Sequence, residues 1–127
     1  MKEVMAVIRM NMMNRTKRVL TDAGVSSMHA RECLGRGKGL VDFKLLRGAE
    51  QGYEEAISQL GSSQRLVPKR MISMIVPDGM VERIVRAIIE TNSTGKSGDG
   101  KIFVMPVTEA YRIRTGERGN ETLDEAY

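Results

Sequence analysis

The order of strand-like and helix-like patterns constrains this chain more than any single motif, because strand, helix, strand occurs twice along it. The predicted elements are, in order, strand Lys2–Met10, helix Arg15–Ala23, strand Val25–Cys33, strand Arg70–Val76, helix Gly79–Asn92, strand Lys101–Val107 and a short strand Tyr111–Thr115. This order is typical of an α+β fold of βαββαβ type, an antiparallel sheet with both helices on one face.

Local signals suggest where the two helices begin and end. Asn14 is a predicted N-cap of the first helix, and Gly24 is its predicted C-terminal stop. Pro77 ends the preceding strand, and Asp78 is predicted to cap the second helix.

Two of the strands carry apolar residues on both faces. Met5 and Val7 alternate with the apolar residues of the other face, and the strand Arg70–Val76 is similarly two-sided. Because two helices cover only one face of such a sheet, the other would be exposed to water. The pattern therefore predicts a homo-oligomer with clefts between neighbouring subunits.

At 127 residues the chain has room for one domain, predicted over residues 1–115. Residues 34–69 interrupt the regular pattern as a long loop, which in a compact domain is usually functional or disordered. Residues 116–127 form a polar tail.

Composition limits the kind of protein and its partners. No apolar run reaches the roughly 20 residues that span a bilayer, and no secretory leader is recognised, so we expect a cytoplasmic protein without membrane insertion. A single cysteine, Cys33, excludes an internal disulfide, and His29 lacks neighbours at metal-ligand spacing. The net charge of +4 favours an anionic partner, but the few aromatic residues favour a small phosphorylated ligand over nucleic acid.

A glycine-rich turn, residues 94–100, runs directly into the strand Lys101–Val107. Its glycines permit turned backbone whose N–H groups approach a ligand closely, and Lys96 and Lys101 add positive charge. The same composition also suits a plain hairpin turn, and the spacing is not that of a P-loop. The turn therefore predicts either a phosphate site or a hairpin.

Two further segments supply similar chemistry. Residues 35–39, Gly-Arg-Gly-Lys-Gly, form a second cluster of glycines and cations. Arg112 and Arg114 alternate on the predicted last strand, so both guanidinium groups would project from one face, where a phosphate matches their planar forks. Two solvated arginines on an edge strand are the alternative.

These residues together resemble the PII family of nitrogen-regulatory signal-transduction proteins. The resemblance covers roughly Met1 to Glu117 and is most specific in residues 94–104 and 111–117, with further motifs at 35–39, 46–50 and 75–78. It implies a ferredoxin-like homotrimer whose three clefts bind ATP or ADP. It also implies that Mg²⁺ and 2-oxoglutarate join ATP there, and that the loop docks on a target protein.

The resemblance also implies roles for individual residues. The nucleotide-binding residues would be Met28, His29, Gly35, Arg36, Gly37, Gly98, Asp99, Gly100, Lys101, Arg112 and Arg114. The 2-oxoglutarate contacts would be Gly37, Lys38, Gly39 and Lys69. No residue is predicted to be catalytic, and no protein metal ligand is assigned.

Two departures from the family pattern affect regulation. The glycine loop at residues 35–39 is two residues shorter than usual and lacks the glutamine that ligates magnesium, so effector binding could differ in geometry or affinity. Leu46 and Gln51 replace the loop tyrosines, so uridylylation at that site is excluded.

A lengthened loop without the acceptor tyrosine is similar to the nitrogenase-linked branch of the family. The resemblance is to the longer-looped member of a pair that binds the molybdenum–iron component of nitrogenase and blocks it until 2-oxoglutarate releases it. An ammonium channel or glutamine synthetase is the alternative target. A small ATP-using enzyme is the alternative class, although the turn offers no convincing general base.

Overall fold

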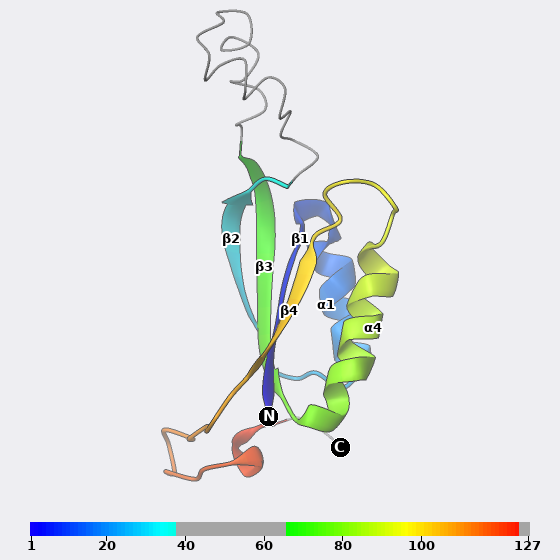
Figure 1. The fold of residues 1–127 in the computed structure, drawn as a ribbon. Helices are drawn as coiled ribbons and strands as arrows, with labels where there is room; N and C mark the ends of the chain where they lie inside the picture. The colour runs from blue at the N-terminus through cyan, green and yellow to red at the C-terminus, as the bar shows by residue number, and fades with distance from the viewer. Residues whose placement is uncertain (38–65, 125–127) are drawn as a thin grey trace, which may run out of the picture.

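The strands pair in the order β2-β3-β1-β4, and every pairing is antiparallel. This computed structural model describes residues 1–37 and 66–124. The helices and strands are β1 Lys2–Arg9, α1 Met13–Asp22, β2 His29–Gly35, β3 Val67–Val76, α4 Val81–Asn92 and β4 Lys101–Pro106. Both helices lie on the same side of the sheet (Figure 1), so the predicted α+β architecture and its βαββαβ order are confirmed.

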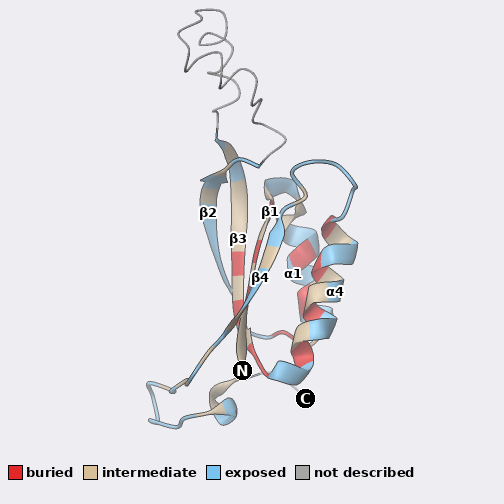
Figure 2. Cartoon of the chain, in the orientation of Figure 1, coloured by how far each residue is buried: buried red, intermediate tan, exposed pale blue. Residues whose placement is uncertain are grey.

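The core forms between the helices and one face of the two central strands. Strand periodicity places Val4, Ala6 and Ile8 of β1 on this face, and Ile72 and its alternate neighbours on β3 join them. Leu20 of α1 and Ile84 and Ile88 of α4 pack against them, and buried positions face inward from both layers (Figure 2). This arrangement fixes which residues of each strand point away from the helices.

The opposite face of the sheet has no covering element among the described residues. Its apolar side chains are Met5, Val7, Met71, Ile75, Phe103 and Met105. Phe103 is 45% exposed, and the one polar pair at the centre is satisfied by a 2.6 Å hydrogen bond from the Ser73 hydroxyl to Glu3. An apolar sheet face of this kind is what the sequence predicted.

Both predicted N-terminal caps are wrong. A 3₁₀ turn, Met10–Met12, leads into α1, and no side chain caps it, so Asn14 lies within the helix. Asp78 begins another 3₁₀ turn ahead of α4. Its carboxylate forms an ion pair with the N-terminal amino group of Met1, at an N–O distance of 3.0 Å. The 3₁₀ turns, and not side-chain caps, therefore lead the chain into both helices.

The predicted end of the first helix is confirmed, and it explains why β2 begins late. Gly24 has a φ of +100°, its N–H donates to Thr21, and the N–H of Val25 donates to Leu20, which is the Schellman pattern. Val25 is buried as the apolar residue that completes this motif. The predicted strand Val25–Cys33 is therefore wrong at its start, and β2 begins at His29.

The sequence predicted a short strand after β4, but this part of the chain forms an arm instead. We define the C-terminal arm as residues 107–124; it leaves the sheet beside Met1, whose carbonyl accepts the N–H of Val107. Within it Tyr111 pairs with Arg118 in an isolated bridge, and the N–H of Gly116 donates to Arg112 at 2.7 Å. The residues between form a turn, so the predicted strand Tyr111–Thr115 is wrong.

The long loop is shorter than predicted at both ends, because β2 continues to Gly35 and β3 begins at Val67. Its central part, including Lys38, Gly39, Leu46 and Gln51, lies outside the described residues. In the part of the chain that is described, neither helix has the length and apolar character needed to cross a membrane.

Candidate functional site

The glycine-rich turn joins α4 to β4 at one end of the sheet. Gly95, Gly98 and Gly100 have φ values of +80°, +97° and +110°, a region that other residues rarely adopt. Gly100 also lies directly against β1, since a Cβ placed on it would come within 1.9 Å of the Val7 carbonyl oxygen. The turn therefore depends on glycine for both conformation and space.

The Asp99 carboxylate fixes the shape of this turn from within. It accepts hydrogen bonds from the backbone N–H groups of Thr94 at 2.8 Å and Gly95 at 3.1 Å, and from the Thr94 hydroxyl at 2.5 Å. Among the described residues, the N–H groups of Ser97 and Gly98 have no hydrogen-bond acceptor. Those N–H groups are the kind of donors that bind phosphate oxygens.

Two cations from neighbouring strands bind the same turn. Arg9 donates to Asp99 at 2.5 Å and to the Ser97 carbonyl at 2.8 Å, and Lys69 donates to the Gly98 carbonyl at 2.8 Å. Arg9 and Lys69 are directly paired across β1 and β3, which explains why they reach the turn together. Of the two, only Arg9 contacts the Asp99 carboxylate. Lys101 is exposed at the start of β4, so the turn and its flanks carry more cations than carboxylates, which favours an anion.

Arg9 is the residue that sequence reasoning missed. The sequence pattern places Arg9 only in the first strand, and 90 residues separate it from Asp99. No local sequence pattern joins the two residues, because the antiparallel pairing of β1 with β4 is what brings Arg9 beside Asp99.

The same hydrogen bonds strongly lower the pKa of Asp99. The Thr94 hydroxyl has the largest effect, followed by the Thr94 N–H and the Arg9 guanidinium. The carboxyl group is consequently ionised throughout the neutral range and is a poor proton carrier. This property fits a structural role in the turn and does not fit general base catalysis.

Asp99→Asn is expected to destabilise the protein by an amount that is constant from about pH 7 to about pH 5. The pKa is lower in the folded state, so the stabilisation is present above the unfolded value near 3.8 and is lost as the pH falls towards the folded value. Urea unfolding of both proteins at about pH 7, 5 and 3 measures this difference. Glu82→Gln, at an exposed carboxylate, is the control, and a difference that already closes by about pH 5 would contradict the assignment.

The structure brings some of the predicted site residues together at this end of the sheet. Gly35 lies at the end of β2, where a Cβ placed on it would be 3.9 Å from the side chain of Lys69, and Arg36 and Gly37 follow it. Gly98, Asp99, Gly100 and Lys101 form the turn itself. Lys69, Arg9 and the turn are thus one cluster, and residues 35–37 continue from β2 beside Lys69.

The remaining predicted residues lie far from that cluster within one chain. Met28 packs against the core just before β2, and His29 begins β2 opposite Ser73. Arg112 and Arg114 are in the C-terminal arm, at the end of the sheet where Met1 lies (Figure 1). Because β1 spans about 23 Å at about 3.3 Å per residue, Arg114 and the glycine-rich turn do not meet in one chain.

The two arginines also differ in their surroundings. Arg112 is bound to its own chain, donating to the Glu121 carbonyl at 3.1 Å and to Asp124 at 3.4 Å. Arg114 is exposed at the turn of the arm. They do not project from a common strand face, since no strand forms there.

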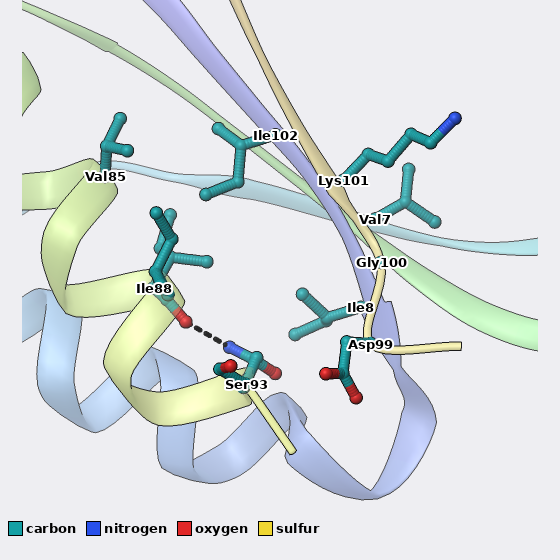
Figure 3. Close-up of a pocket in the computed structure, with 11 residues that line it drawn as sticks. Val7, Ile8, Val85, Ile88, Ser93, Asp99, Gly100, Lys101 and Ile102 are labelled. Carbon is teal, nitrogen blue, oxygen red and sulfur yellow. Dashed lines mark hydrogen bonds between the residues drawn. The ribbon is translucent and has the colours of Figure 1, made fainter. Parts of the chain in front are cut away.

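A pocket of about 400 Å³ lies beside the glycine-rich turn, between α4 and β4. Asp99, Gly100 and Lys101 border it on one side, and Val85, Ile88 and Ile102 supply apolar side chains (Figure 3). We call it the α4–β4 pocket. Among the described residues, no group of three His, Cys, Asp or Glu side chains is placed to bind a metal ion.

Comparison with known proteins gives a consistent assignment. The family description "Nitrogen regulatory protein P-II" matches residues 1–117. "Nitrogen fixation nifHD region GlnB-like protein 2" of Methanothermobacter marburgensis is 45% identical over 97% of this chain and 100% of its own length. The protein of the same name from Methanobacterium ivanovii is 43% identical, over 97% of this chain and 99% of its own.

A bacterial relative carries the family name itself. "Nitrogen regulatory protein P-II" of Haemophilus influenzae is 37% identical over 97% of this chain and all of its own length. Taken with the fold and the glycine-rich turn, these matches establish that the chain belongs to the P-II family of nitrogen regulatory proteins.

Proposed function

We propose that this P-II protein senses ATP or ADP, with the phosphates bound at Gly98–Lys101. The observation that supports this most is the turn itself, whose shape is set by Asp99 and Arg9 while the N–H groups of Ser97 and Gly98 have no acceptor among the described residues. Binding an anion there needs little reorganisation, which favours affinity. Members of this family are signal transducers and not enzymes.

We propose further that the complete nucleotide site lies between two subunits of a homotrimer. One subunit supplies Gly35–Gly37 and the glycine-rich turn, and its neighbour supplies Arg112, Arg114, Met28 and His29. The separation of these two groups within one chain supports this arrangement, and so does the uncovered apolar face of the sheet. Repeated around a closed ring, each subunit would contribute to two sites.

The second effector in this proposal is 2-oxoglutarate, bound by Lys69 with Gly37, Lys38 and Gly39. Lys69 already donates to the Gly98 carbonyl, so a carboxylate at the same ammonium group would act directly on the glycine-rich turn. An ammonium group has three donors, so it could serve both partners. Magnesium would be held chiefly by the ligands themselves, because the family's glutamine is missing.

The target that we propose is the molybdenum–iron component of nitrogenase in the cytoplasm, contacted through the loop between β2 and β3. The names of the similar archaeal proteins refer to a nitrogen fixation region, which supports this choice. A paired P-II subunit could join the complex. An ammonium channel or glutamine synthetase is the alternative target. We do not propose that the protein binds nucleic acid or inserts into a membrane.

Calorimetric titration with MgATP, with and without 2-oxoglutarate, tests this function. We expect each ligand to increase the binding affinity of the other roughly tenfold, because linkage between two binding sites is reciprocal. Lys69→Met should remove the coupling while ATP still binds. The absence of ATP and ADP binding would refute the sensor, whereas ATP binding unaffected by 2-oxoglutarate would remove only the second effector.

A further inference from the structure

We propose that Ile113 of one copy of the chain inserts into the α4–β4 pocket of a neighbouring copy, beside that copy's glycine-rich turn. This inference rests on the proposed two-subunit nucleotide site and adds an apolar contact that anchors the arm there. The occupant of the pocket is therefore a defined segment of a second copy.

Ile113 is the most exposed large apolar residue among those described. Its relative exposure is 101%, whereas Ile89, on the rim of the pocket, is 52% exposed. An isoleucine held fully in water gains from any apolar site that it can enter. A single exposed apolar residue is not unusual by itself, and what distinguishes Ile113 is its position next to Arg114 on an ordered turn.

The arm presents Ile113 on a defined turn. The N–H of Arg112 donates to the Glu117 carbonyl at 2.8 Å, and the N–H of Gly116 donates to the Arg112 carbonyl at 2.7 Å. The Arg112 side chain then ties the turn to Glu121 and Asp124. Because these bonds already order the turn, docking it would cost less conformational entropy than docking a flexible tail.

The pocket suits such a side chain. Its lining includes the aliphatic residues Val85, Ile88, Ile89 and Ile102, and its volume of about 400 Å³ exceeds that of one isoleucine side chain. Ser93, Asp99 and Lys101 also border the pocket, as does Asn92. Asn92 is buried, and its Oδ1 has no hydrogen-bond partner among the described residues. The Asn92 amide nitrogen donates to the Thr16 hydroxyl and to the Ile88 carbonyl, so this side chain is held in place at the pocket.

The α4–β4 pocket lies next to the proposed nucleotide site. Asp99, Gly100 and Lys101 belong to both, and Ile113 and Arg114 are consecutive in the arm. An arm that brings Arg114 to the phosphates therefore brings Ile113 to the mouth of the pocket. Since the arm lies at the opposite end of the sheet from its own pocket, this contact forms only between copies.

Disulfide trapping tests the contact directly. The full chain would carry Ile113→Cys and Ile89→Cys together with Cys33→Ser, and a head-to-tail ring predicts oxidation to covalent species up to the full oligomer. Each single-cysteine variant should give at most a covalent dimer. Covalent dimers alone, or no cross-link at all, would overturn the contact.

A second pair of variants measures what the contact contributes. Ile113→Ser should weaken MgATP binding roughly tenfold, and Ile113→Val should change it less than about twofold, because Val keeps most of the buried apolar area. Ile89→Ser combined with Ile113→Ser should cost no more than either alone. Additive losses would argue against insertion. Unchanged MgATP affinity in Ile113→Ser with normal wild-type binding overturns this inference alone, whereas a wild-type protein that binds no nucleotide overturns the proposed function.

Discussion

Gly100→Ala is expected to disrupt the protein more severely than alanine at any other glycine that the structure describes. The new Cβ would lie 1.9 Å from the Val7 carbonyl oxygen, which is backbone in a central strand and cannot move aside. The φ of +110° adds strain for any residue other than glycine. We expect a loss of more than about 3 kcal/mol in unfolding free energy and a loss of MgATP binding of at least about a hundredfold. Urea unfolding and calorimetry measure the two effects.

Gly95→Ala is the matched control for this substitution. Gly95 also has a positive φ, of +80°, but no heavy atom lies within 4 Å of a Cβ placed there. Gly95→Ala should lower the free energy of unfolding by about 1 kcal/mol, because only the unfavourable backbone conformation contributes. Equal effects of the two substitutions would mean that the close approach of Gly100 to β1 is not what fixes the turn.

Mixing two variants that each bind nucleotide weakly is expected to restore tight binding at some of the sites. Lys101→Ala removes an ammonium group that we propose binds phosphate next to the glycine-rich turn, and Arg114→Ala removes the guanidinium group that we propose the neighbouring arm supplies. Each alone should weaken MgATP binding roughly tenfold to a hundredfold, the size of a lost charge-assisted hydrogen bond, without dissociating the oligomer. In oligomers reassembled from equal amounts of both, about one quarter of the sites would combine an intact turn with an intact arm.

The double variant Lys101→Ala/Arg114→Ala is the control for this experiment and should bind no better after the same treatment. Recovery of a high-affinity fraction in the mixed oligomers, measured by calorimetric stoichiometry, would support a site between subunits. If the mixture binds no better than its components, then Arg114 acts within its own chain or not at all.

Several local predictions failed for a shared reason. Asn14 and Asp78 have the right chemistry for helix caps, but 3₁₀ turns precede both helices and Asp78 binds the N-terminal amine. Residues 111–115 alternate like a strand, yet an isolated strand needs a partner and β4 ends at Pro106. In each case a tertiary contact or its absence outweighed a weak local preference.

The sequence by itself determined the elements with strong periodicity and the residues with special backbone needs. The core strands, the stripe of α4, the stop at Gly24 and the glycines of the turn could all be predicted, because each depends on neighbours within a few positions. Only the tertiary structure brought Arg9 and Lys69 to the turn and separated Arg114 from it by the length of the sheet. These relations depend on strand pairing across as many as 90 residues, which local propensities do not encode.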